Sequence, residues 1–147
     1  MFPMSLDGEF KLTSPELEDI SAILSKVEQA LRAARATNIS RIGNRVVFQG
    51  GIFRLVMNWN ILVPVGRGEI EIVPGKPGTV KYGFSCVQML ILLTLMVGAM
   101  SVALISREGL SAHAIIFLVI GWLWLFGMNY VISAVRLPRF VRRAVGV

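Results

Sequence analysis

The sequence predicts an α+β membrane protein in which an N-terminal helix packs on a small antiparallel β-meander and a two-span transmembrane helical hairpin follows. Of the 147 residues, 54% are hydrophobic and only 16% are charged, which is too apolar for an ordinary soluble domain. Two long runs, 83–106 and 109–135, lack any Asp, Glu, Lys or Arg, and each exceeds the ~20 residues that cross a bilayer. One small module and two spans fill this length, which excludes a large catalytic fold.

Residues 1–13 are expected to form an N-terminal extension. This stretch carries Asp7 and Glu9 and lacks both a basic n-region and an apolar h-region, so it does not have the features of a signal peptide. We therefore expect the first span to direct insertion into the membrane.

Residues 14–36 have the pattern of an amphipathic helix and open the predicted cytoplasmic helix-plus-sheet domain, 14–82. Ser14 is a suitable cap, Pro15 suits the first turn, and apolar residues then recur at steps of three and four. The apolar stripe consists of Leu17, Ile20, Leu24, Val27 and Leu31. It can cover the sheet of its own domain, or it can face a partner subunit as a short coiled-coil-like seam.

The segment from Arg41 to Ser85 changes to short β-branched and aromatic runs separated by Gly, Pro and Asn, which predicts a β-meander. The predicted strands are Arg45–Gln49, Ile52–Met57, Ile61–Val65, Glu69–Val73 and Thr79–Ser85. Glu and Ile alternate strictly over residues 69–72, so this strand is expected to face water on one side only.

The transmembrane hairpin, 83–135, is predicted because only Arg107 and Glu108 separate the two uncharged runs. So short a connection makes the spans antiparallel, and the alternative of one long helix is disfavoured by the charged pair between Ser106 and Gly109. Ten of the fifteen Lys and Arg residues precede the first span, and four follow the second. The positive-inside rule therefore predicts that both termini are cytoplasmic, with a bacterial inner membrane as the simplest setting.

Two groups of residues are expected at the membrane interface. Lys81 and Tyr82 stand where the first uncharged run begins, and such side chains are typical of the headgroup region. The tail, 136–147, is predicted to bend at Pro138 and to lie on the cytoplasmic leaflet as a basic amphipathic segment that contacts anionic lipids. Its basic arc is Arg136, Arg139, Arg142 and Arg143. The alternative is that this arc recognises an acidic patch on a partner.

Few features of the hairpin suggest chemistry. His113, near the outer end of the second span, is a candidate axial ligand for a haem or chlorin, although a lone histidine near an interface more often forms a hydrogen bond to a backbone carbonyl or a water. Thr94, Gly98 and Ser101 form a small-residue strip that lets another helix approach closely. Because the chain has a single His and a single Cys, no metal site and no other cofactor are expected.

Known enzyme signatures are absent from the sequence, so we expect a protein that is not an enzyme. The preferred hypothesis is a non-catalytic accessory or scaffolding subunit of a larger respiratory, photosynthetic, secretory or transport complex. Its partners are then other integral membrane subunits, with no nucleic acid and no small-molecule substrate. The alternative is a membrane-tethered cytoplasmic module that binds a lipid headgroup, a peptide or a regulator.

Overall fold

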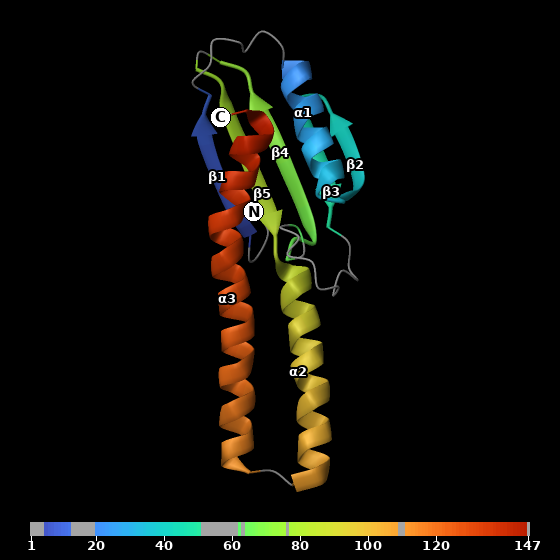
Figure 1. The fold of residues 1–147 in the computed structure, drawn as a ribbon, viewed down its shortest axis with the longest axis vertical. Coiled ribbons are helices and arrows are strands. Elements are labelled where there is room, and N and C mark those ends of the chain that lie inside the picture. Colours follow the sequence, from blue (N-terminus) through green and yellow to red (C-terminus); the bar gives the residue numbers. More distant parts are fainter. Residues whose placement is uncertain are drawn as a thin grey trace.

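The computed structural model of the chain describes residues 5–12, 20–50, 62, 64–75, 77–108 and 111–146 (Figure 1). The elements in chain order are β1 (Ser5–Lys11), α1 (Ile20–Ala33), β2 (Thr37–Ile42), β3 (Arg45–Gln49), β4 (Arg67–Val73), β5 (Thr79–Ser85), α2 (Val87–Glu108) and α3 (Ala112–Val145). The strands lie together at one end, and α2 and α3 extend from them as an antiparallel pair.

Within the described residues, the strands form one five-stranded antiparallel sheet in the order β1-β5-β4-β3-β2. The strands β2 to β5 follow one another as a meander, and β1 then pairs with β5 from Ser5↔Ser85 to Lys11↔Thr79. This pairing places the first strand of the chain beside the last one. Residues of β4 alternate between buried and partly exposed, so one face of the sheet is covered and the other is open.

The predicted strands match the observed ones in part. Arg45–Gln49 and Thr79–Ser85 are found with these bounds, and the predicted strand Glu69–Val73 begins two residues earlier, at Arg67. Ile52–Met57 lies outside the described residues. The prediction of a strand over Ile61–Val65 is wrong for its described members, since Leu62, Pro64 and Val65 lie in turns or irregular backbone.

Two strands were not anticipated. The structure places β1 within the stretch expected to be an extension, and β2 lies between the predicted helix, 14–36, and the first predicted strand, Arg45–Gln49. The helix α1 stops at Ala33 because the chain then turns through Arg35 at a φ of 60°. The amide of Ala36 donates to the carbonyl of Leu31 at 2.8 Å and that of Arg35 to Arg32 at 2.8 Å, the paired bonds of a Schellman cap.

The apolar core lies between the sheet and a layer formed by α1 and the C-terminal part of α3. Leu24, Val27 and Leu31 of α1 are fully buried in the same cluster as sheet residues such as Phe48 and Ile70. The C-terminal part of α3 adds Leu137, Val141, Ala144 and Val145 to this cluster. The core therefore joins both ends of the described chain.

The helix α3 is continuous over 34 residues and includes Pro138 in its interior. The structure differs here from the expected bend at Pro138 and from a tail lying on the membrane surface. The apolar side of the tail packs in the core of the domain, because Leu137 and Val141 are fully buried. The helix ends beyond Val145, where Gly146 adopts a φ of 91° and its amide donates to the carbonyl of Arg142 at 3.0 Å.

Candidate functional site

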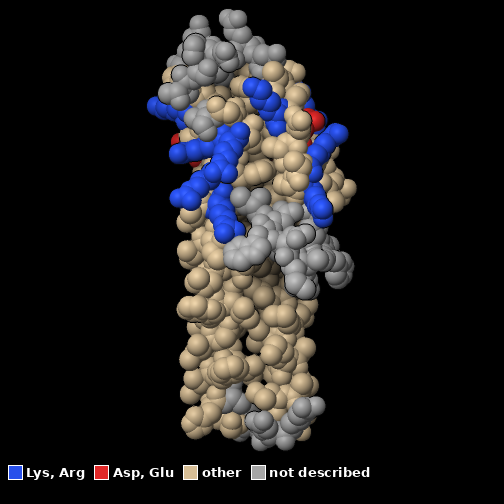
Figure 2. Space-filling model, in the orientation of Figure 1, with Lys and Arg blue, Asp and Glu red and all other residues tan. Residues whose placement is uncertain are grey.

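The surface of the α2–α3 hairpin is apolar along its length. Except for Ile42, every exposed large hydrophobic residue in the described part of the chain lies on these two helices. The spans found by length and hydropathy are Val87–Ser106 and Ile115–Val145, and none of the most apolar stretch of either is buried inside the protein. In Figure 2 the lower half of the face shown has neither blue nor red side chains. An exposed apolar surface of this size is typical of contact with lipid or with other proteins.

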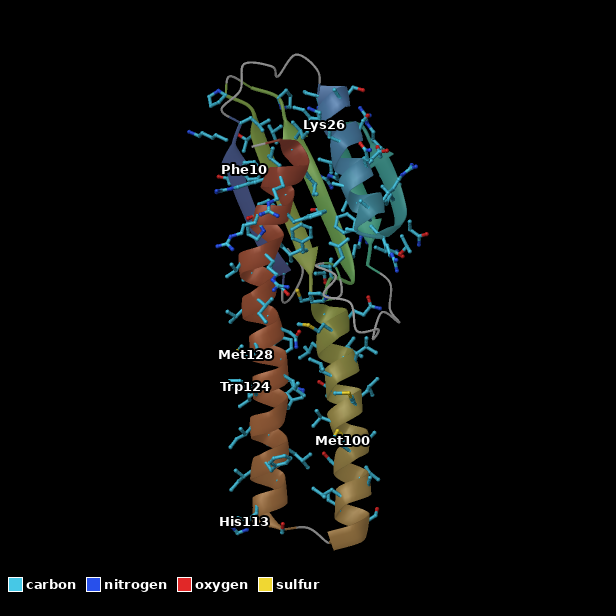
Figure 3. The ribbon with its side chains drawn as sticks, in the orientation of Figure 1. Phe10, Lys26, Met100, His113, Trp124 and Met128 are labelled. Atoms are coloured by element: carbon cyan, nitrogen blue, oxygen red, sulfur yellow. The ribbon has the colours of Figure 1, made fainter. Side chains whose placement is uncertain are left out.

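An aromatic row on α3 packs toward α2. Trp122 stacks on Phe126 with ring centroids 5.6 Å apart, and Phe126 stacks on Tyr130 at 6.1 Å. The indole Nε1 of Trp122 donates to Thr94 Oγ1 of α2 at 3.1 Å. Trp124 and Met128 lie on the side of α3 that points away from α2 (Figure 3).

The row continues toward the sheet as one stripe on α3. Its members are partly or fully buried residues that recur at steps of three and four: Trp122, Phe126, Tyr130, Ser133, Leu137, Val141 and Ala144. The lower part of the stripe faces α2, and the upper part enters the domain core. One helix face therefore holds the hairpin and the domain together.

The three residues of the small-residue strip, Thr94, Gly98 and Ser101, have different surroundings in the structure. Thr94 bonds to α3 through Trp122, and Ser101 Oγ donates to the carbonyl of Val97 in its own helix at 2.7 Å. A Cβ added at Gly98 would meet nothing within 4 Å. Thr94 thus belongs to the contact within the hairpin, whereas Gly98 lies on open surface.

His113 lies at the end of α3 farthest from the sheet (Figure 3), where it is exposed. Within the described residues, no group of three or more His, Cys, Asp and Glu side chains is arranged to hold a metal ion.

The structure places Lys81 and Tyr82 inside β5, five to six residues before α2 begins at Val87. At about 3.3 Å per residue, Tyr82 is about 16 Å from that point. Its ring contacts Phe84 at a centroid distance of 5.5 Å and Phe10 at 6.3 Å. Tyr82 therefore packs in the domain and Lys81 lies on the open face of the sheet, and their place at the membrane boundary stays a prediction.

The side chain of Arg142 connects the end of α3 to β1. Its guanidinium lies 5.5 Å from the centroid of the Phe10 ring, within the range of a cation–π contact. Burial raises the pKa of Tyr82 above its ordinary value of 10.0, and the positive charge of Arg142 acts in the opposite direction. Phe10, Tyr82 and Arg142 therefore form a junction between the two ends of the described chain.

The four arginines of the tail lie on the side of α3 opposite its buried residues. Leu137 and Val141 face the core, whereas Arg136, Arg139, Arg142 and Arg143 are exposed. In Figure 2, blue side chains gather over the upper part of the molecule on the face that α3 covers. We call these four residues the arginine face.

The open face of the sheet carries most of the described carboxylates. Strand pairing forms a row of alternating charge across four strands, in which Glu9 pairs with Lys81, Lys81 with Glu71 and Glu71 with Arg45. In the next row Asp7 and Glu69 flank Gly83. We call Asp7, Glu9, Glu69 and Glu71 the carboxylate face.

A shallow open groove of about 690 Å³ lies over the carboxylate face, and Lys81 and Gly83 also line it. Arg45 forms ion pairs with Glu69 at 3.4 Å and Glu71 at 3.3 Å, and these side chains remain well exposed to water. Asp7 and Glu9 were not expected on this face from the sequence. The signal was the alternation of polar and apolar residues from Ser5 to Lys11, which has the period of a strand.

The stripe expected to face a partner is largely occupied within the chain itself. Leu24, Val27 and Leu31 have no exposed surface, and Ile20 packs against the same core. Leu17 lies outside the described residues. These three buried side chains are therefore not available to a second protein.

No known protein family model matches this chain, and no curated protein and no solved structure matches it either.

Proposed function

We propose that this chain is a two-span integral membrane protein that acts as a non-catalytic accessory or scaffolding subunit of a larger membrane complex. The observation that carries the proposal is the exposed apolar surface of α2 and α3, none of whose most apolar stretch is covered by the rest of the protein. Lipid and neighbouring spans are the environments in which such a surface is stable.

The continuity of α3 supports a scaffolding role. The same helix that would cross the membrane also contributes Leu137 and Val141 to the domain core, so no linker separates the span from the domain. The sheet is also joined to α2 without a linker, because only Cys86 stands between β5 and α2. A domain held by two helices keeps a fixed orientation relative to the bilayer, as a scaffold that positions a neighbour requires.

The distribution of charge supports an orientation with the domain in the cytoplasm. Arg136 and the arginines beyond it lie at the domain end of the hairpin, and ten further basic residues precede the first span. The positive-inside rule retains such flanks on the cytoplasmic side. We therefore propose that both termini are cytoplasmic and that the protein resides in a bacterial inner membrane.

Open surface on the hairpin supports contact with neighbouring spans. Gly98, Gly121 and Gly127 have nothing within 4 Å of an added Cβ, so they leave room for another helix to approach closely. Trp124, 66% exposed on the side facing away from α2, is a large aromatic anchor for such a neighbour. No chemistry at His113 is needed for this role.

The alternative function is a membrane-tethered module that binds a ligand with its cytoplasmic domain. The groove over the carboxylate face favours it, since Lys81 and four carboxylates converge there. Their exposure and mutual pairing are also typical of a solvated sheet face, so we rank this function second.

Extraction of native membranes with a mild detergent, followed by native-gel separation and mass spectrometry of the band, tests the proposed function. We expect the chain to migrate with other membrane subunits in fixed ratio and to be degraded when produced without them. We further expect Gly98→Leu to release the chain from the complex, whereas Ala103→Leu, on another side of α2, leaves it bound. A chain that migrates and persists alone would overturn the proposal.

A further inference from the structure

The end of the domain nearest to the hairpin carries arginines on several elements. The strand pairs Thr37↔Gln49, Gln49↔Arg67 and Arg67↔Ser85 form the row of the sheet closest to α2, and Arg67 is the charged member of this row. The side chain of Arg67 is exposed. It lies on the open face of β4, in alternation with the buried residues of that strand.

The helix α1 ends at the same level as this row. Figure 1 shows that the C-terminal end of α1 is the end nearer to the hairpin. Arg35 comes two residues before Thr37, and its amide donates to the carbonyl of Arg32 at 2.8 Å. Both arginines are exposed, as is Arg136 on α3. We call these residues the basal arginines: Arg32, Arg35, Arg67 and Arg136.

Arg67 stands close to the level at which the first span begins. It pairs with Ser85, which is two residues before the start of α2 at Val87. At about 3.3 Å per strand residue, this places it about 7 Å above the span. The headgroup layer of a bilayer adds about 5 to 8 Å to each side of the hydrocarbon core. Arg67 and the adjacent end of α1 therefore stand at headgroup level.

Arg136 stands slightly higher, at the outer boundary of the same layer. The hydrogen bond between Trp122 and Thr94 sets α2 and α3 level with each other, and seven residues further on Asn129 lies beside Val87. At about 1.5 Å per helical residue, Arg136 is about 10 Å above that level. Its long side chain can reach down to the headgroups, as arginine side chains near a membrane do.

The carboxylates of the domain begin above the basal arginines. In the next row of the open face, Asp7 and Glu69 flank Gly83, which is about 13 Å above the span. On α1, Glu28 is one turn farther from the hairpin than Arg32. In the part of the domain that the structure describes, the level of the basal arginines therefore holds four cations and no acid.

The higher members of the arginine face stand too far from the headgroups. The helix α3 continues through Pro138, which places Arg139 about 15 Å and Arg143 about 20 Å above the start of α2. Both are about one screening length or more above the headgroups, since that length is about 8 Å at physiological ionic strength. The attraction of a basic residue to an anionic leaflet falls off within this distance.

We propose that the basal arginines bind the phosphates of anionic phospholipids in the cytoplasmic leaflet. The inference rests on the membrane insertion put forward under the proposed function, and it names the lipid class that the domain contacts. Arginine suits a phosphate because its planar guanidinium donates two parallel hydrogen bonds. The lipid contact thus passes from the whole arginine face, which the sequence favoured, to one level of the domain.

The basal arginines lie on both sides of the domain. Arg67 belongs to the open face of the sheet, whereas Arg32, Arg35 and Arg136 belong to the helix layer and the cap of α1. Phosphates bound on opposite sides oppose tilting of the domain in either direction. Because no linker separates the domain from the spans, this contact fixes the surface that the domain presents to a neighbouring subunit.

Lipid preference in reconstituted vesicles tests the inference with the full-length chain. Spin-labelled phosphatidylglycerol and spin-labelled phosphatidylcholine are compared in phosphatidylcholine vesicles, and electron paramagnetic resonance measures the fraction of each that the protein immobilises. We expect the parent chain to immobilise phosphatidylglycerol in preference. Flotation with the vesicles shows that each variant inserts, and far-UV circular dichroism shows that it is folded.

The basal variant, Arg32→Gln/Arg35→Gln/Arg67→Gln, should lose this preference. We expect the ratio of phosphatidylglycerol to phosphatidylcholine association to fall at least about threefold. Each arginine at the leaflet strengthens the attraction of an anionic lipid about fivefold, and the ratio averages over all lipids around the hairpin. Arg136 is retained because it also helps to set the orientation of the span.

The matched control, Lys26→Gln/Arg139→Gln/Arg143→Gln, removes the same charge from exposed residues higher on α1 and α3. It should keep the preference of the parent chain. An equal loss in the control would overturn the inference, because the lipid would then contact the higher arginines or respond only to net charge.

Salt gives a second test on the parent chain alone. Raising NaCl from about 0.1 M to about 1 M shortens the screening length from about 10 Å to about 3 Å, so the preference should fall. A preference that salt leaves unchanged would overturn the inference. The absence of any preference would also overturn it and would leave an acidic protein surface as the partner of the basal arginines.

Failure of the proposed function is a separate result. It is read from the native gel, where a chain that migrates alone contradicts the subunit role and leaves the lipid contact intact. A chain that does not float with the vesicles contradicts the membrane insertion on which both proposals rest. A chain that inserts without preferring phosphatidylglycerol contradicts this inference alone.

Discussion

Trp122 and Thr94, 28 positions apart in the chain, join the two helices of the hairpin through a hydrogen bond of 3.1 Å. In a hydrocarbon environment the indole N–H has no water to bond, so its partner on α2 matters more than it would at a wet surface. The bond also sets the level of one helix against the other, and through α3 it sets the height of the domain.

Thr94→Val removes the acceptor at almost unchanged volume. We expect the hairpin to lose about 0.6 to 2 kcal/mol of stability, measured by reversible denaturation in detergent micelles. Thr94→Ser, which keeps the hydroxyl, is the control and should stay close to the parent chain. Equal losses for both variants would show that packing, not the hydrogen bond, explains the effect.

Leu137→Ala tests whether the end of α3 belongs to the domain core. Because Leu137 is fully buried, we expect the free energy of unfolding of the domain to fall by about 2 to 5 kcal/mol. Arg139→Ala, on the exposed side of the same turn, should change it by no more than about 0.5 kcal/mol. If the tail instead lay on lipid, Leu137→Ala would weaken membrane attachment and leave the thermal unfolding of the domain unchanged.

Arg142→Gln should raise the pKa of Tyr82 further, because it removes the positive charge that opposes the effect of burial. Titration of the phenolate by ultraviolet absorbance in a Tyr130→Phe background measures this directly, since the chain has two tyrosines. The folded-state pKa is raised, so stability from this group is present below pH 10 and declines as the pH rises beyond it. A downward shift of the pKa in Arg142→Gln would contradict the placement of Arg142 near the ring.

Cys86 should resist alkylation at neutral pH. The side chain is fully buried at the junction of β5 and α2, and burial raises the pKa of its thiol from 9.0 to about 11. Because the thiolate is the reactive form, we expect iodoacetamide to label the folded protein slowly until the pH approaches 11. Labelling after denaturation should be fast at pH 9, and fast labelling of the native protein at pH 8 would show that the junction is open.

Local patterns in the sequence were sufficient for several elements. The long uncharged runs predicted two apolar helices because a span requires about 20 consecutive residues, and α2 and α3 contain them. The strict alternation of Glu and Ile over residues 69–72 predicted a strand with one wet face, and Glu69 and Glu71 lie on the open face of β4 while Ile70 and Ile72 are buried. Membrane insertion and its direction remain predictions.

For the tail, 136–147, the sequence pattern did not predict which surface its apolar side covers. Its sequence has one basic and one apolar side, and this pattern is the same whether the apolar side covers lipid or a sheet. Pro138 favoured a bend, yet burial of Leu137 and Val141 outweighs the loss of one backbone hydrogen bond, and the helix continues. Likewise, the apolar stripe of α1 did not indicate whether it would pack on the sheet of its own domain or on a partner protein.

The sequence by itself determined the two long apolar helices, the helix α1 and the three strands β3, β4 and β5, because these properties depend on neighbours within a few positions. Only the tertiary structure decided that β1 completes the sheet beside β5, that Arg142 lies over Phe10, and that the acids of β1 and β4 share one open face. Such arrangements join residues far apart in the chain. Their stability depends on how strands pair and which surface α3 covers, and no local period in the sequence records either.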